Sequence, residues 1–290
     1  LDSSLNVGII VKQLSKVGKK LHTFSIGMEG SDDLKKSRIV ADFHDTIHTE
    51  IKYTEQEALN VMEDVIKCVE TFDTTTIRAS VGQYLLAKYI SENTNFKVLL
   101  NGDGADEVCM GYMYFHIAPT PNDAQSNSTK LITNMFQFDG QRVDRTLSNF
   151  GLEARLPFAD CKFMTFINNI DPQLKIPKKD RIEKYIIRKA FSEIYKNNPI
   201  LPDEILWRRK EAFSDGVSGQ KKSWYIIAKE YAESKITQSE FENLKKLTHC
   251  PPTSMEEAYY RKVFNNFYGN IAAETIPYYW RPEWTNTLDP

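Results

Sequence analysis

The chain has 290 residues, of which 41% are hydrophobic and 26% charged, and its formal net charge is -2. This composition is close to the globular average, so it excludes a disordered, a collagen-like or a coiled-coil protein, and the length suffices for one large α/β domain. The small net charge argues against nucleic acid or an anionic membrane as the main partner, and no apolar run is long enough for a membrane span.

Helices and short apolar strands alternate along the first hundred residues. The spacing predicts, in order, a helix that begins near Leu5 and ends at Lys19-Lys20, a strand over residues 21–28, a helix over 33–44, a strand over 48–53, a helix from a Thr54–Glu57 capping box to Val69, a helix over 77–91 and a strand over 96–100. This alternation predicts a parallel sheet with helical crossovers, in which ligands bind beyond the carboxyl ends of the strands. The loop over residues 101–107 is therefore predicted to lie at a binding site.

Strand signals fade after about residue 112. Residues 118–128 are polar and contain prolines, which indicates a linker. Helical pattern then predominates, in segments near residues 129–149, 160–169, 181–196, 221–235 and 254–268. We therefore predict an α/β part over residues 1–117 and a mostly helical part over 129–290, packed together as one structural domain.

The first candidate site is the loop Asn101-Gly102-Asp103-Gly104-Ala105-Asp106-Glu107. Its glycines allow a ligand to approach the backbone closely, and its three carboxylates are suited to hold Mg²⁺ on a polyphosphate. An acidic turn exposed to solvent would have the same composition, so the residue types alone leave both interpretations open.

Two further clusters allow both a functional and an ordinary interpretation. Leu1-Asp2-Ser3-Ser4 opens a predicted helix whose amino end favours anions, although these residues equally suit a simple helix cap. Trp207-Arg208-Arg209-Lys210 is a basic run followed by Glu211-Ala212-Phe213-Ser214-Asp215-Gly216, and such a run is most often a solvated face.

In this order the three clusters resemble the synthetase domain of glutamine-hydrolysing asparagine synthetases, and the resemblance spans nearly the whole chain. Leu1-Asp2-Ser3-Ser4 is similar to the tail of that family's pyrophosphate loop, S-G-G-x-D-S-S. The other similar segments are Glu70-Thr71-Phe72-Asp73, Thr76-Ile77-Arg78-Ala79-Ser80, Gly111-Tyr112, Tyr114-Phe115-His116, Gly151-Leu152-Glu153-Ala154-Arg155-Leu156-Pro157-Phe158, Glu183-Lys184 and Arg209-Lys210-Glu211-Ala212-Phe213-Ser214-Asp215-Gly216. The resemblance implies a parallel sheet of the ATP-pyrophosphatase (adenine nucleotide alpha hydrolase-like) type, with residues 1–117 as the nucleotide-binding part.

The resemblance also implies a two-step ligase reaction that uses aspartate, ATP and ammonia. The β-carboxylate of aspartate attacks the α-phosphorus of ATP and releases pyrophosphate, and ammonia then displaces AMP from β-aspartyl-AMP to give asparagine. Mg²⁺ and lysines are needed to neutralise the charge that moves onto pyrophosphate. The implied roles are Asp2 and Asp106 for Mg²⁺; Asp2, Ser3, Ser4, Ile26, Asn101 and Gly102 for ATP and pyrophosphate; Asp103, Lys184 and Lys210 for catalysis; and Arg78, Glu107, Asp139 and Arg142 on the substrate side.

Two departures from the family pattern bear on this interpretation. The family's S-G-E-G is Asn101-Gly102-Asp103-Gly104 here, so the carboxylate expected to orient the intermediate and the incoming amine is one methylene shorter. The first strand of the sheet, the Ser-Gly-Gly of the loop and the amino-terminal glutaminase domain lie outside these 290 residues, so we expect the chain alone to be inactive.

We expect the glutaminase domain of a parent chain to supply the ammonia, and we also expect a cytoplasmic location and a homodimer, with neither nucleic acid nor membrane as a partner. Two alternatives stay open. One is a nucleotide-binding relative that has lost catalysis, supported by Asp103, and the other is a cyclase similar to β-lactam synthetases.

Overall fold

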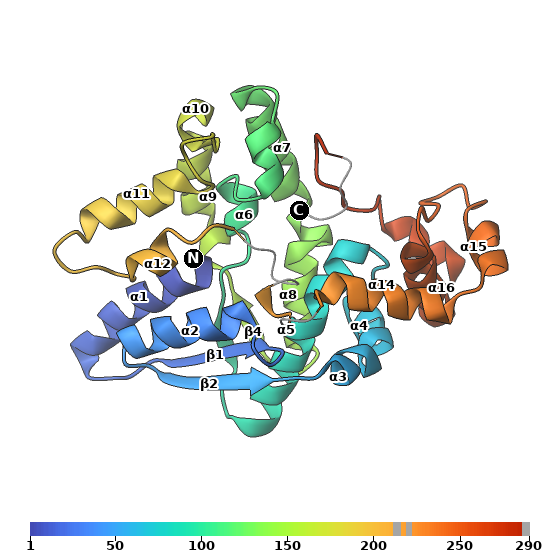
Figure 1. Cartoon of the computed structure of the whole chain (residues 1–290), viewed down its shortest axis with the longest axis horizontal. Coiled ribbons are helices and arrows are strands. Elements are labelled where there is room, and N and C mark those ends of the chain that lie inside the picture. The colour runs from blue at the N-terminus through green and yellow to red at the C-terminus, as the bar shows by residue number, and fades with distance from the viewer. Residues whose placement is uncertain (211–215, 219–221, 286–290) are drawn as a thin grey trace.

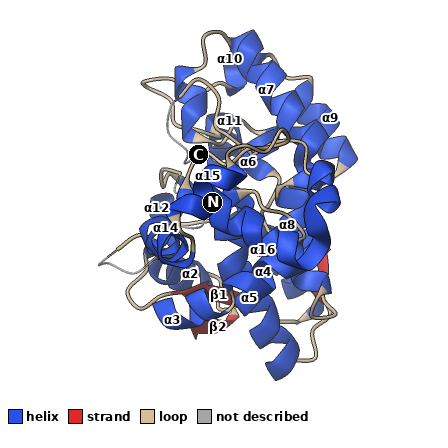
Figure 2. Ribbon diagram, turned by 90° about the vertical axis from the view of Figure 1, so that its right-hand side faces the viewer, coloured by secondary structure: helices blue, strands red, loops and turns tan. Residues whose placement is uncertain are grey.

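The computed structural model describes residues 1–210, 216–218 and 222–285, and its strands form two parallel pairs among many helices (Figures 1 and 2). Strand β1 (His22–Gly27) pairs with β2 (Ile47–Lys52), and β3 (Val98–Leu100) pairs with β4 (Glu153–Arg155). The predicted parallel pairing is thus confirmed. The described strands, however, form two separate pairs, and the finer assignment to the ATP-pyrophosphatase type stays a prediction.

The first half follows the predicted order closely. Three helices and two strands lie within a few residues of their predicted positions: α1 (Asp2–Leu14), α2 (Asp32–Phe43), α5 (Thr74–Asn93), β1 and β2. Helix α1 ends earlier than Lys19, because the 3-10 turn η1 (Ser15–Val17) and left-handed Gly18 close it. The Thr54–Glu57 capping box is confirmed, but one predicted helix is two, α3 (Glu55–Asn60) and α4 (Met62–Val69).

The prediction of a linker over residues 118–128 is wrong, because α7 (Pro121–Asn134) begins inside it. Thr120 caps this helix by accepting a hydrogen bond from the Asp123 amide. Pro121 lies in the first turn, where backbone N–H groups have no acceptor within the helix, so a proline costs no hydrogen bond there. The proline that indicated a linker is therefore a helix start signal. The predicted helix over residues 129–149 is likewise divided, at η3 (Met135–Gln137).

Strand β4 was missed, because a three-residue Glu-Ala-Arg segment has neither the length nor the β-branched residues of a predictable strand. It lies within residues 129–290 but pairs with β3, so the two predicted parts of the chain share this strand pair. The remaining elements are α6 (Ala105–Val108), η2 (Met113–Ile117), α8 (Asp139–Ser148), η4 (Pro157–Ala159), α9 (Cys161–Asn168), α10 (Pro172–Lys175), α11 (Tyr185–Ile194), α12 (Asp203–Leu206), α14 (Trp224–Lys235), α15 (Gln238–Leu244), α16 (Met255–Ala272) and η5 (Ala273–Thr275).

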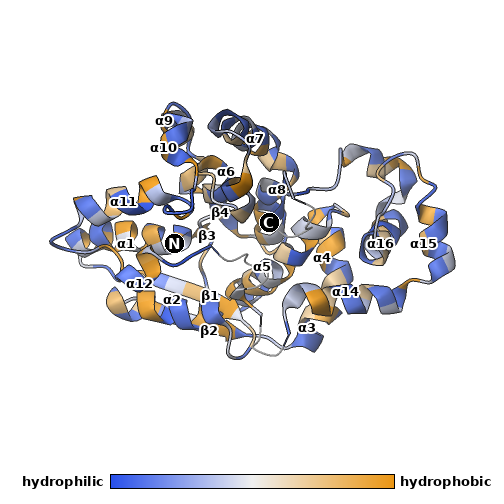
Figure 3. Cartoon of the chain, turned by 45° about the horizontal axis from the view of Figure 1, so that its top comes forward, coloured by the Kyte–Doolittle hydropathy of each residue, from blue (hydrophilic) through white to orange (hydrophobic). Residues whose placement is uncertain are grey.

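The largest core cluster joins β1 and β2 to α4, α5, α14 and α16. Figure 3 shows α4 largely hydrophobic, whereas α10 and α15 are largely hydrophilic. A second cluster packs α1 against α11 and α12 on the other side of the molecule, as Figure 1 shows. Across the part of the chain that the structure describes, no helix combines the length and the apolar character needed to cross a bilayer.

Asp73 joins α5 to the carboxy-terminal segment and gives the fold a testable pH dependence. Its carboxylate caps α5 at the Thr76 amide (2.9 Å) and accepts from the Trp280 amide (2.6 Å). Burial nevertheless raises the pKa of Asp73 from 3.8 to about 6. A carboxyl with a higher pKa in the folded state stabilises the fold below its unfolded pKa, and this contribution is lost as pH rises through 6.

We therefore expect Asp73 to lower the free energy of unfolding by on the order of 3 kcal/mol between pH 4 and pH 7. Urea unfolding of the parent and of Asp73→Asn at pH 4 and pH 7 measures this pH-dependent contribution of Asp73, which the variant should lack. The difference in stability between parent and variant should therefore shift by this amount between pH 4 and pH 7, because the amide carries no charge whose burial becomes costly as pH rises. An identical pH dependence in the two proteins would contradict the assignment, and exposed Asp64→Asn is the control.

Candidate active site

A cavity of about 690 Å³ opens at the carboxyl ends of β1 and β3, under the start of α1. Its volume is within the range of small-molecule sites, roughly 300–1,000 Å³. Every candidate residue named from the sequence lines it: Asp2, Ser3, Ser4, Ile26, Arg78, Asn101, Gly102, Asp103, Asp106, Glu107, Asp139, Arg142, Lys184 and Lys210. The fold thus brings together residues from seven separate segments of the chain, while their individual roles stay predictions.

Two lysines converge on one carboxylate at the inner end of the cavity. Lys184 Nζ lies 2.6 Å from Asp106 Oδ1 and 2.5 Å from Asp2 Oδ2, and Lys210 Nζ lies 2.8 Å from Asp106 Oδ2. Burial alone would raise the pKa of Asp106, but the two ammonium groups outweigh it and hold that pKa well below its usual range. Asp106 therefore stays ionised between the two ammonium groups.

Lys184 reaches this position through an unusual backbone conformation. It precedes α11 with a left-handed φ of 56°, which is uncommon for a residue other than glycine, and its side chain is buried. Burial lowers the pKa of its ammonium, but Asp106 and Asp2 more than compensate and raise it. Strain of this kind persists where surrounding contacts fix the residue, which is common at functional sites.

The donor set at this end of the cavity fits Mg²⁺ on a nucleotide. Asp2 and Asp106 approach a single point, the Lys184 ammonium, from α1 and from α6. Mg²⁺ is usually held by one or two carboxylates together with substrate phosphates and water, so these two side chains suffice. Among the described residues there is no cluster of three or more His, Cys, Asp or Glu that could hold a metal by itself.

The backbone at Gly102 leaves no room for a side chain. An added Cβ would lie 2.6 Å from the Ser3 amide nitrogen and 2.7 Å from Asp2 Cβ, so the loop after β3 packs directly on the first turn of α1. Ser3 is exposed and Ser4 is half-buried. The cap interpretation of these residues is wrong, since Leu1 occupies the N-cap position and, in the chain as described, no side chain caps α1.

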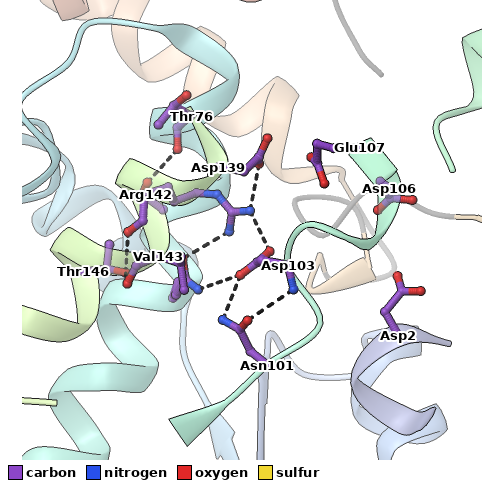
Figure 4. A network of polar contacts seen from close by, with 12 residues as sticks. Asp2, Thr76, Asn101, Asp103, Asp106, Glu107, Asp139, Arg142, Val143 and Thr146 are labelled. Atoms are coloured by element: carbon purple, nitrogen blue, oxygen red, sulfur yellow. Dashed lines mark hydrogen bonds and ion pairs between the residues drawn. The ribbon is translucent and has the colours of Figure 1, made fainter. Parts of the chain in front are cut away.

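Asp103 is held by a polar network on the opposite side of the cavity (Figure 4). Its Oδ1 accepts from Arg142 Nη2 at 2.8 Å, and its Oδ2 accepts from Asn101 Nδ2 at 2.8 Å and from Gln83 Nε2 at 3.2 Å. The same Arg142 nitrogen lies 2.9 Å from Asp139 Oδ1. The guanidinium is thus placed between two carboxylates, 23% and 24% exposed toward the cavity.

Glu107 lies behind this network and differs from its acidic neighbours in protonation. Burial, the charges of Asp139 and Asp106 and a hydrogen bond with Asp139 raise the pKa of Glu107 well above its usual value. The Tyr112 hydroxyl donates to Glu107 Oε1 at 2.5 Å. These effects favour the neutral form of Glu107, which lies behind Asp139 on the cavity wall, and its substrate-side role stays a prediction.

Two other predicted residues lie at the edges of the cavity. Ile26 is 3% exposed and lies one residue before the end of β1, where it belongs to the main core as well as to the cavity wall. Arg78 donates from Nε and Nη2 to both carboxylate oxygens of Glu256, at 2.8 and 2.6 Å. This buried pair ties α5 to α16, so the guanidinium has a structural partner beside its predicted substrate role. Residues 211–215 of the basic motif lie outside the described residues.

Three residues of the site were not assigned roles from the sequence. Gln83 bonds to Asp103 and, through Oε1, to Arg142; Asn6 Nδ2 donates to the Asn101 carbonyl; and Glu183 accepts from the Lys210 amide at 2.6 Å. Gln83 shares one face of α5 with Thr76 and Ser80, all buried. This polar stripe on a buried helix is a sequence signal for Gln83. Asn6 and Glu183 contact residues that are distant in sequence, so no local pattern predicts them.

Gly111 packs directly behind the paired charges and provides a test of their placement. An added Cβ would lie 2.1 Å from Asp106 Oδ1 and 2.1 Å from Lys184 Cε, so any side chain must displace both. We expect Gly111→Ala to weaken binding of Mg·ATP by about 10-fold, because a misplacement of about 1 Å at such a site has effects of this size or larger. Calorimetric titration measures it. The control for a general loss of stability is Gly18→Ala, whose Cβ meets nothing within 4 Å but whose left-handed φ of 66° strains an alanine away from the paired charges. Equal affinities in parent and Gly111→Ala would contradict the geometry.

Comparison with known proteins gives one family. A family model described as asparagine synthase matches residues 1–130 and 118–287. Over 293 aligned residues, the chain is 42% identical to asparagine synthetase (glutamine-hydrolyzing) of Homo sapiens, 41% to that of Bos taurus and 40% to that of Gallus gallus. Each alignment covers 100% of this chain and 51% of the relative, so the chain spans about half the length of the relatives it matches.

Proposed function

This chain belongs to the asparagine synthase family, and we propose that its cavity converts aspartate and ammonia to asparagine with cleavage of ATP to AMP and pyrophosphate. The β-carboxylate of aspartate attacks the α-phosphorus, and the bond to the departing pyrophosphate breaks. Ammonia then attacks the activated carbonyl carbon, and AMP leaves with the former carboxylate oxygen.

One observation carries the proposal: Lys184 and Lys210 converge on Asp106 and Asp2 at a strand end inside one cavity. Attack of a carboxylate on a polyphosphate brings like charges together, so cations placed where charge develops lower the barrier. In the proposal Asp2 and Asp106 would hold Mg²⁺, which supplies charge neutralisation at the phosphate oxygens when bound. Lys184 and Lys210 then move from carboxylate to phosphate partners.

The opposite wall suits the amino-acid substrate. Arg142 lies between Asp103 and Asp139, so this wall offers one guanidinium and two carboxylates within hydrogen-bond distance of each other. A zwitterion with an additional carboxylate needs both signs of charge. We propose that Arg142 and Asp139 bind the backbone groups of aspartate, and that Asp103 faces the reacting carbonyl and the incoming ammonia.

The test is an assay with aspartate, ATP, Mg²⁺ and ammonium in which AMP and asparagine are measured together. It uses the chain and an extended form, in which an apolar strand ending in Ser-Gly-Gly is joined ahead of Leu1. We expect the extended form to make AMP and asparagine in equal amounts with ammonium, but no asparagine with glutamine. Retention of ATP without product would favour a degenerate nucleotide-binding relative, and a cyclised product would favour a cyclase.

A further inference from the structure

Asn101 is fixed at its backbone from two directions. Its amide donates to the Arg155 carbonyl at 3.1 Å, which continues the β3–β4 ladder by one residue, and its carbonyl accepts from Asn6 Nδ2 of α1 at 2.8 Å. A residue held on both sides by a strand and a helix presents its side chain in one direction. That direction is toward Asp103, as the close-up of Figure 4 shows.

The Asn101 side chain and residue 103 form a reciprocal pair. Asn101 Nδ2 donates to the Asp103 carboxylate at 2.8 Å, while the Asp103 amide donates back to Asn101 Oδ1 at 3.2 Å. Only a carboxamide offers a donor and an acceptor side by side at this reach, because a serine hydroxyl is one bond shorter. The carboxamide therefore determines where the short Asp103 carboxylate lies.

We propose that Asn101 is a positioning residue that sets the place of the Asp103 carboxylate, so that positions 101 and 103 act as one unit in the step in which ammonia displaces AMP. This inference rests on the proposed function for its chemical step. Gln83 and Arg142 hold the other sides of the same carboxylate, so its two oxygens receive three side-chain donors. A glutamate at position 103 cannot keep all of these partners while Asn101 occupies the space beside it.

The unit predicts non-additive effects of substitution. Asn101→Ser removes the carboxamide that holds Asp103, and Asp103→Glu moves the carboxylate away from it. In the double variant the two new side chains should fit together, because the smaller serine leaves room for the longer glutamate, which then reaches Gln83 and Arg142. We therefore compare the two single variants with the double variant, and use exposed Asn93→Ser and Asp64→Glu, singly and together, as the matched control set.

The first measurement is the melting temperature of the 290-residue chain. We expect each single variant to lower it by about 2–4 °C, as the loss of one or two hydrogen bonds does, and the double variant to lower it by at least about 2 °C less than the sum. The control set should be additive. Additive melting temperatures at positions 101 and 103 would overturn the proposal.

The second measurement, made with the same substitutions in the extended form, is the amount of asparagine formed per AMP released. We expect this ratio to fall about 10-fold in each single variant and to return within about 3-fold of the parent in the double variant, with half-saturation by ATP changed less than about 2-fold. A ratio that stays constant across all variants would show a purely structural pair and overturn the proposal. If no form makes asparagine, the proposed function fails, while the melting temperatures still decide whether positions 101 and 103 are coupled.

Discussion

Asp106→Asn should lower the rate of AMP formation by about 100- to 1,000-fold, because the substitution removes the carboxylate on which the two cavity lysines converge. Lys184 Nζ is 2.6 Å from Oδ1 and Lys210 Nζ is 2.8 Å from Oδ2. The rate is measured in the extended form as AMP released from ATP and aspartate over a Mg²⁺ titration, in which the variant should need more Mg²⁺ for half-maximal activity.

The same substitution should also destabilise the fold, which a carboxylate in an exposed glycine-flanked loop would not do. The Lys184 side chain is 3% exposed and that of Asp106 16%, and removing one partner of a buried ion pair costs about 3–5 kcal/mol. Asp45→Asn is the matched control, since the Asp45–Lys20 pair is exposed and should contribute nothing measurable. An Asp106→Asn protein with unchanged Mg²⁺-dependent AMP formation would disprove the metal and phosphate assignment.

Extending the chain at Leu1 should give the second large effect, for a reason visible in the cavity. The cavity continues from the charged cluster as an apolar slot between β1 and β3, with walls formed by Phe24, Leu86, Ala87, Ile90, Phe96, Leu99 and Leu147. Among the described strands, β1 pairs only with β2 and β3 only with β4. Val98 and Leu100 are 46% and 49% exposed, although strands of parallel sheets are ordinarily covered on both faces.

An apolar strand added ahead of Leu1 can enter this slot and pair with β1 and β3. The glycines of Ser-Gly-Gly would then provide backbone amides for phosphate next to Asp2. We expect the extended form to melt several degrees higher and to make asparagine from ammonium at least about 100-fold faster than the 290-residue chain.

A control extension carries lysines at the apolar positions of the strand and keeps Ser-Gly-Gly. It should restore neither the melting temperature nor the activity, because charged side chains cannot fill an apolar slot. If the 290-residue chain by itself turns over ATP with aspartate at the rate of the extended form, the added strand and its Ser-Gly-Gly are dispensable. The placement of the phosphate site at Asp2, Ser3 and Ser4 would then be wrong.

The elements that could be predicted are those whose signals are local. β1 and β2 are six-residue segments in which Phe24, Ile26 and Ile51 stand among β-type residues, and α2 and α5 have apolar positions at helical spacing, so the local pattern predicts them. The start of α7 was missed because a threonine and a proline before polar residues indicate a cap and a linker equally well. β4 exists only because β3 offers it a partner, and no pattern within its three residues contains that information.

The sequence predicts which residues form the candidate site but not which of them contact one another. Asp103 and Arg142 were both named from the resemblance, yet nothing in the sequence places Arg142 between Asp103 and Asp139. Gln83 joins the network because α5 passes beside the loop after β3, which is a tertiary fact. The positioning role of Asn101 likewise depends on distances across the loop. The sequence alone indicates only that the carboxylate at position 103 is one methylene shorter than in the family pattern.

The most direct test of the account follows the oxygen of the aspartate side chain. Aspartate labelled with ¹⁸O in its β-carboxylate is incubated with the extended form, ATP, Mg²⁺ and ammonium, and the AMP is analysed by mass spectrometry. Because a carboxylate oxygen bonds to the α-phosphorus and leaves with AMP, we expect one ¹⁸O in each AMP and one in each asparagine side chain. Unlabelled AMP, or ADP and phosphate in its place, would contradict activation of aspartate by adenylation in this cavity.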